Sequence, residues 1–143
     1  MRKLPRTTFF LLLALLMLIG GSQRANAASC YRYEPDVVVV EGTLQLKAFA
    51  GPPNYKSLEF GDQPQAVWML TPLQPLCIAA LEDDAWNIAR DAVQIIEIIP
   101  RTSFNVSLNG KLVQVQGTLS RARGGHRHAE ILMRATFVAP KQP

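Results

Sequence analysis

The chain has few of the residues that carry out catalysis. Its 143 residues include only two histidines and two cysteines. No Gly-rich phosphate loop, dinucleotide-binding fingerprint or Ser-His-Asp spacing signature occurs in it. The cysteines do not form a Cys-x-x-Cys pair, which disfavours thiol redox chemistry. The adjacent acids Asp83 and Asp84 are more typical of a helix cap than of an acid–base pair. We therefore predict a protein that is not an enzyme and holds no cofactor.

The chain also lacks an apolar run long enough for a permanent membrane span. Its longest run covers Phe9 to Ile19, whereas a spanning helix needs about 20 residues. The run follows a basic segment and precedes a small-x-small site at 25–27. This pattern predicts a signal peptide over residues 1–27, cleavage after Ala27, and a periplasmic protein without stable membrane insertion. A lipoprotein acylated on Cys30 is less favoured, because its box would begin with Ala instead of Leu.

The exported part lacks an excess of positive charge. Four of the 15 basic residues lie in the signal peptide, which leaves 11 basic residues against 11 acidic ones. A nucleic-acid-binding domain would need a basic excess. The formal charge of +4 on the whole chain therefore belongs to the export signal, and we predict no nucleic-acid partner.

Both cysteines, Cys30 and Cys77, lie in the exported part. An even count in an oxidising compartment predicts a disulfide bond between them, with two free thiols as the alternative.

Alternation of apolar and polar residues with a period of two predicts a mainly β domain. One face of the first strand holds apolar residues, and the other face holds residues such as Glu41 and Lys47. The predicted strands cover residues 37–48, 66–71, 76–81, 113–119 and 131–137.

The segment 82–99 fits more than one structure. Asp83 or Asp84 could cap a short helix, after which Val93 to Ile99 would form a buried strand. A single longer helix also fits the spacing. We favour the helix followed by the strand.

Five or six short strands with one short helix predict a small closed or partly open β-barrel that is OB-fold-like. A small β-sandwich is the second choice. The domain is predicted over residues 28–138, followed by a disordered tail at 139–143.

The last two strands are predicted to form a hairpin around Gly124-Gly125. The apolar residues of both strands are all odd-numbered, and residues opposite each other point to the same face. The residue numbers of two cross-strand partners must therefore add up to an even number. A three-residue loop over 124–126 satisfies this rule and pairs Leu119 with Ile131. A bulge elsewhere would also satisfy it. In this register Arg123 faces Arg127.

Basic and aromatic side chains form the candidate site. We predict that they contact an anionic ligand or a periplasmic protein. The alternatives are a solvated loop and, for the tryptophan, a place in the core. His126 and His128 could also share a metal ion, although a zinc site needs three or four ligands. The predicted ligand-binding residues are Tyr55, Trp68, Arg121, Arg123, His126, Arg127 and His128.

Several short strings occur in the order found in one family. They are Gly51-Pro52-Pro53-Asn54-Tyr55, Gly61-Asp62, Trp68 with Leu70, Pro75-Leu76-Cys77-Ile78, Gly110-Lys111 and Gly125-His126-Arg127-His128. With these strings the chain resembles the secreted bacterial proteins grouped as domain of unknown function 4431. The resemblance implies an exported domain and supplies no activity. Members of that family tend to have three histidines followed by threonine at the hairpin tip, where this chain has Arg127 and Ala129.

These observations lead to three functional hypotheses. The first is a periplasmic binding module that uses the Arg/His hairpin tip. The second is an inhibitor or immunity protein that blocks a cell-wall hydrolase, because a rigid, disulfide-tied protein suits that role. The third is a metal-binding protein that uses the two histidines.

Overall fold

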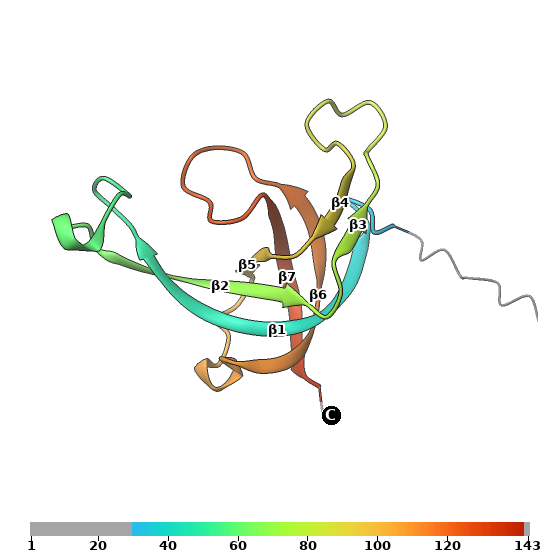
Figure 1. Cartoon of the computed structure of the whole chain (residues 1–143). Coiled ribbons are helices and arrows are strands. Elements are labelled where there is room, and N and C mark those ends of the chain that lie inside the picture. The colour runs from blue at the N-terminus through green and yellow to red at the C-terminus, as the bar shows by residue number, and fades with distance from the viewer. Residues whose placement is uncertain (1–29, 142–143) are drawn as a thin grey trace, which may run out of the picture.

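The computed structural model of the chain describes residues 30–141 (Figure 1). The predicted signal peptide and its cleavage site lie outside the described residues. Within residues 30–141, no helix is long and apolar enough to cross a membrane.

Five strands close into a barrel in the order β1-β2-β5-β7-β6, and β6 pairs back with β1. All neighbours are antiparallel except β5 and β7, which run parallel. This arrangement confirms the prediction of a mainly β protein built on a small barrel. The barrel strands are β1 (Val37–Ala50), β2 (Pro64–Pro72), β5 (Ile96–Pro100), β6 (Lys111–Arg121) and β7 (Ile131–Pro140).

The barrel interior holds the core, and it is filled by the apolar faces that alternation predicted. Val40 and Leu44 of β1 are fully buried, as are Val113 and Val115 of β6. Tyr33, which precedes β1, is also buried, and its hydroxyl donates a hydrogen bond to the Ile88 carbonyl at 2.9 Å.

A second, two-stranded sheet consists of β3 (Leu76–Ile78) and β4 (Arg90–Val93). Cys77 of β3 forms the predicted disulfide with Cys30. Next to it, the Tyr31 N–H donates to the Cys77 carbonyl at 2.8 Å. The disulfide therefore fixes the start of the described chain against β3.

The prediction of a helix after Asp83 or Asp84 is wrong. Residues 82–89 form turns, and the chain then continues into β4. The Asp84 side chain does accept hydrogen bonds from the backbone N–H groups of Trp86 and Asn87, as a capping residue would. However, Asp83 has a left-handed backbone with φ of 64°, which interrupts a right-handed helix. The described helical elements are two 3-10 turns, η2 (Leu58–Phe60) and η3 (Val106–Leu108).

The hairpin of β6 and β7 is confirmed, but its predicted register is wrong. Leu119 pairs with Met133 instead of Ile131, and Arg121 pairs with Ile131. The rule of an even sum does not exclude this shift of two residues, because both registers keep the apolar faces of the two strands on one side of the sheet. A bulge between Gln116 and Gly117 changes the register again. The connecting loop accordingly covers residues 122–130.

The end of β7 lies in the segment that was predicted to be a tail. Ala139 and Pro140 pair with β6, and the Lys141 N–H donates to the Leu112 carbonyl at 2.9 Å. Residues 142–143 lie outside the described part of the chain.

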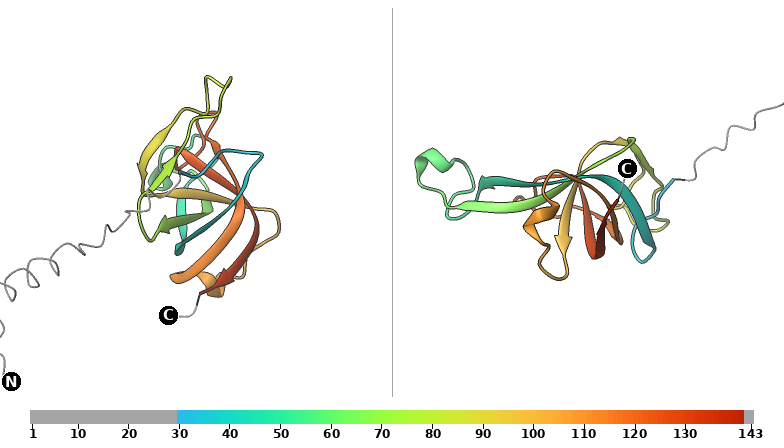
Figure 2. Two further views of the ribbon diagram at one scale, coloured as in Figure 1. Left: turned by 90° about the vertical axis from the view of Figure 1, so that its right-hand side faces the viewer. Right: turned by 90° about the horizontal axis from the view of Figure 1, so that it is seen from below.

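Strands β1 and β2 extend beyond the barrel as a two-stranded arm (Figure 2). Pairing of β1 with β6 ends at Leu44, and pairing of β2 with β5 begins at Trp68. The two strands nevertheless remain paired with each other as far as Ala50 and Pro64. We call residues 45–50 and 64–67, with the loop that joins them, the β1–β2 arm.

We predict that Gly117→Ala destabilises the protein by about 1–3 kcal/mol, the usual cost of overpacking. A Cβ at this buried position would lie 2.2 Å from the Arg134 carbonyl oxygen. The measurement is the free energy of unfolding in urea. Gly125→Ala is the control, because its Cβ would meet no atom within 4 Å. Equal stabilities of the two variants would contradict the prediction.

Candidate functional site

The loop between β6 and β7, residues 122–130, is the tip loop (Figure 1). On one side it contacts the β1–β2 arm, and on the other side it contacts the loop between β3 and β4, residues 79–89. Most of the residues that the sequence singled out lie on this surface.

Two ring stacks join the tip loop to the arm. The ring of His126 stacks on Tyr55 with a centroid distance of 3.9 Å and an interplanar angle of 29°. The ring of His128 stacks on Phe49 at 3.8 Å and 13°. The structure thus brings Tyr55 to the predicted histidines, although about 70 residues separate them in the chain.

A buried carboxylate anchors the centre of the tip loop. Glu97 of β5 is 5% exposed at its side chain. Its Oε1 accepts a hydrogen bond from Arg127 Nη1 at 3.1 Å, and its Oε2 accepts one from the His128 backbone N–H at 2.6 Å. The Arg127 side chain is 42% exposed, so part of this cation faces solvent.

The base of the tip loop is held by a shared carboxylate. Oε1 of Glu130 accepts hydrogen bonds from Arg90 Nε at 2.7 Å and from Arg121 Nε at 3.0 Å. The hydrogen bond from Arg90 lowers the pKa of Glu130 below its usual value, and the charge of Arg121 adds to this effect. The Arg121 guanidinium also lies 4.9 Å from the ring centroid of Trp86. Arg121 is therefore a structural part of the site.

Arg123 lies at the far end of the tip loop. Its Nη2 is 3.8 Å from Asp84 Oδ2, and its guanidinium is 5.9 Å from the Trp86 ring centroid. The arginine is 71% exposed, while the Asp84 side chain is 26% exposed. The backbone N–H of Trp86 lowers the pKa of Asp84, which keeps this acid ionised. A pocket lies beside Arg123, Gly124 and Trp86.

The predicted contact between Arg123 and Arg127 is wrong. Each arginine faces a carboxylate of another element, Asp84 for Arg123 and Glu97 for Arg127. The longer tip loop separates the two side chains that a tight turn would have placed opposite each other.

Trp68 belongs to the core, which was the alternative to its predicted role in binding. It is buried, and its ring centroid lies 6.0 Å from that of Phe104. It also lines a groove of about 410 Å³ that reaches Arg127 and Glu97. Trp68 therefore touches the edge of the site without being presented on its surface.

The two histidines do not form a recognisable metal site. They stack on different rings, those of Tyr55 and Phe49. Among residues 30–141, no group of three or more His, Cys, Asp or Glu side chains could hold a metal ion. Nε2 of His128 is buried and has no hydrogen-bond partner among the described residues.

Three residues of the site were missed by the sequence analysis: Trp86, Phe49 and Glu97. A signal existed for Glu97, because it is the one charged residue in the apolar run 95–100. A lone acid in a buried strand needs a partner, since an unpaired buried charge is costly. No comparable signal marked Trp86 or Phe49.

Asp62 organises the loop at the end of the arm. Its carboxylate accepts hydrogen bonds from the backbone N–H groups of Asn54, Lys56 and Ser57 at 2.7 to 2.9 Å. These bonds, that of Ser57 first, lower the pKa of Asp62 below the usual value for an aspartate. The loop that carries Tyr55 is therefore held in one shape by an ionised side chain.

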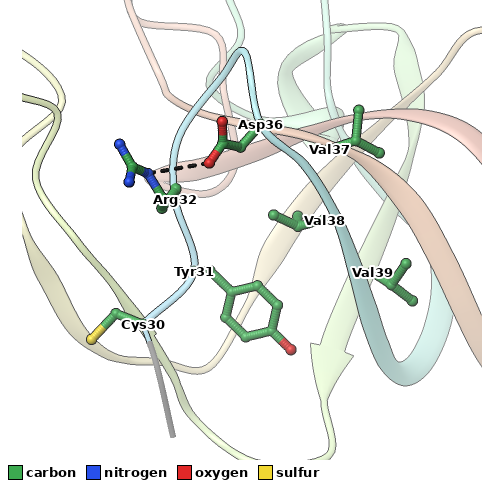
Figure 3. Close-up of a pocket in the computed structure, with 7 residues that line it drawn as sticks. All are labelled: Cys30, Tyr31, Arg32, Asp36, Val37, Val38 and Val39. Carbon is green, nitrogen blue, oxygen red and sulfur yellow. Dashed lines mark ion pairs between the residues drawn. The ribbon is translucent and has the colours of Figure 1, made fainter.

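A further pocket of about 600 Å³ lies beside Cys30 (Figure 3). The charged residues of its wall, Arg32 and Asp36, pair with each other at 3.1 Å. Tyr31 and three successive valines from Val37 form the rest of the wall. It shares no lining residue with the tip loop, so we do not include it in the candidate site.

Comparisons with models of protein families, with curated proteins and with solved structures found no match to this chain. The resemblance to domain of unknown function 4431 therefore stays a prediction.

We predict that Asp62→Asn reduces the dependence of stability on pH in the acid range. The folded-state pKa of Asp62 is lowered, so its contribution to stability is present above the unfolded-state pKa of about 4. That contribution is lost as the pH falls through the folded-state pKa. The free energy of unfolding should fall less steeply between about pH 5 and 2 in the variant than in the wild type.

Asp91→Asn is the control for this experiment, because Asp91 is exposed and has no ion pair within residues 30–141. Parallel pH profiles for wild type and Asp62→Asn would contradict the role of Asp62.

Proposed function

We propose that the protein is a periplasmic binding module, not an enzyme, that contacts an anionic ligand through the arginines of its tip loop. One observation carries this proposal. The carboxylates that pair with Arg123 and Arg127 are 26% and 5% exposed, whereas the arginines are 71% and 42% exposed. Each acid is therefore less exposed than the arginine that it pairs with, and the cations face solvent.

Arg127 is also held in place before a ligand arrives. Glu97 fixes Arg127 directly, and the stacks of His126 and His128 hold the loop on both sides of it. A group that is already ordered loses less conformational entropy on binding. Guanidinium groups with unused donors form strong, charge-assisted hydrogen bonds to carboxylates and phosphates.

The barrel topology supports the same surface by analogy. We propose that the barrel is a variant of the OB-fold, in which the loop between the first two strands and the loop between the last two strands flank the ligand. Here these loops are the end of the β1–β2 arm and the tip loop, and Tyr55 and His126 join them. This step is an analogy of architecture.

The roles of the acids support a function without catalysis. Glu97, Asp62 and Asp84 each accept hydrogen bonds from neighbouring N–H groups. They act as supports for loops. A general acid or base would need access to a substrate proton.

The disulfide supports export, because such bonds persist in oxidising compartments. It also argues against a lipoprotein, since the sulfur of Cys30 is bonded to Cys77 and cannot carry a lipid at the same time.

We expect the double variant Arg123→Gln, Arg127→Gln to bind short-chain inorganic polyphosphate at least about tenfold more weakly than the wild type. Isothermal titration in low-salt buffer measures this affinity, and added salt should weaken the wild-type complex. The control is Arg134→Gln, an arginine that is 66% exposed and 3.9 Å from Glu34. Absence of binding to the wild type, or equal losses in both variants, would refute the proposal.

A second candidate function is inhibition of a cell-wall hydrolase by the β1–β2 arm. Phe60 lies at the end of the arm, is 86% exposed and follows the loop that Asp62 organises. A projecting aromatic side chain on an organised loop can fill a pocket of an enzyme, and the order of the loop backbone reduces the entropic cost.

To test it, cell-wall hydrolases are assayed on peptidoglycan with and without the protein. We expect inhibition that Phe60→Ser removes, because the aromatic anchor is lost. The matched control is Phe137→Ser, since Phe137 is exposed on β7, away from the arm. Inhibition that survives in Phe60→Ser would exclude the arm as the inhibitory element.

A further inference from the structure

The outer edge of β1 in the arm has no neighbouring strand. The pairing of β1 with β6 ends at Leu44, although β1 continues to Ala50. In Figure 2 the arm extends away from the other strands of the barrel. The proposed function does not use the backbone groups of this edge, although the Phe49 ring of the same segment stacks on His128 of the tip loop.

The direction of the backbone groups on this edge follows from the register. Gly51 N–H donates to the Gln63 carbonyl, and Leu73 N–H donates to the Glu41 carbonyl, so odd-numbered residues of β1 form the bonds to β2. Hydrogen bonding alternates along a strand that has neighbours on both sides. The N–H and C=O groups of the even-numbered Ala48 and Ala50 therefore point away from β2.

The edge begins where the side chain of Asn109 ends the β6 ladder. Oδ1 of Asn109 accepts a hydrogen bond from the Leu46 N–H at 2.9 Å, next to the bond from Gly110 N–H to the Leu44 carbonyl. Beyond Leu46, the backbones of Ala48 and Ala50 form no hydrogen bond with another residue of the described chain on this side. Such an open edge is a template for another strand.

The side chains along the edge indicate what kind of strand fits. Lys47 lies between Leu46 and Ala48, is exposed and has no ion pair within residues 30–141. Residues opposite each other in an added strand share a face. The partner of Lys47 would therefore be acidic, and the partners of Leu46 and Ala48, on the other face, would be apolar.

A second copy of this chain fits the edge poorly. Antiparallel pairing of two such edges about Ala48 would place the two copies of Lys47 diagonally opposite on one face, a separation of about 7–8 Å. Like charges at that position disfavour the pair, and lysine is a common device against edge-to-edge association.

We propose that the β1 edge of the arm, at residues 46–50, binds an extended peptide segment of a partner protein as an additional β-strand. The segment alternates apolar residues with an acidic residue that pairs with Lys47. Main-chain hydrogen bonds to Ala48 and Ala50 supply affinity, and the alternation of side chains supplies specificity.

The probe is the blocked peptide acetyl-Val-Thr-Val-Glu-Val-amide, and the measurement is amide hydrogen exchange by NMR on the complete exported chain. We expect saturating peptide to slow exchange at Ala48 and Ala50 by at least about tenfold, because their N–H groups gain partners. The same peptide N-methylated at its central valine keeps the side chains but loses a backbone donor. It should bind at least about tenfold more weakly.

Lys47→Glu tests the charge. We expect this variant to bind the Glu peptide more weakly and to prefer a peptide with Lys in place of Glu. Lys56→Glu is the matched control, because Lys56 is exposed on the adjoining loop and should not change the preference. The variant Arg123→Gln should bind the peptide like the wild type, because Arg123 contacts Asp84 in the loop 79–89 instead of the arm, and this result separates the edge from the arginines of the tip loop.

Three results would overturn the proposal. One is unchanged exchange at Ala48 and Ala50 with saturating peptide, and another is equal binding of the N-methylated peptide. The third is slow exchange at both amides without peptide, together with a dimer in sedimentation, because a second copy would then occupy the edge.

Discussion

The burial of one carboxylate determines how the candidate site is arranged. Glu97 lies in the barrel wall, between Met69 of β2 and Leu132 of β7. A charge in that position destabilises the fold unless it is paired and hydrogen-bonded. The pairing comes from the tip loop, through the guanidinium of Arg127 and the backbone N–H of His128. The barrel therefore sets the position of the loop, and the loop carries the exposed cations.

Two further carboxylates contact arginines of the tip loop or at its base. Asp84 caps the turn after β3 and lies beneath Arg123, while Glu130 joins Arg121 to Arg90 of β4. Asp84 is less exposed than the arginine above it, as Glu97 is, whereas Glu130 is 49% exposed and the arginines that it joins are 22% and 23% exposed. Surface ion pairs add little stability on their own. Their effect here is on geometry, because they hold the tip loop against the loop 79–89 and against strands β4 and β5.

The arm gives the protein a second kind of surface. At its outer end the carboxylate of Asp62 accepts hydrogen bonds from three backbone N–H groups and so holds the loop together. Along its β1 edge, backbone groups remain open because β6 begins only at Lys111. The tip loop offers charged side chains, whereas the edge offers main-chain groups beside one lysine. The two surfaces therefore differ in chemistry although they belong to neighbouring parts of one domain.

The sequence by itself determined the mainly β barrel, the Cys30–Cys77 disulfide and the apolar faces of the strands, because each depends on residue type or on a period of two. It could not determine the register of β6 and β7, since parity is unchanged by a shift of two residues. Nor could it determine the partners of Arg123 and Arg127. Those were decided by tertiary structure, because Asp84 and Glu97 reach the tip loop only after distant strands have closed the barrel and buried the carboxylate that must be paired.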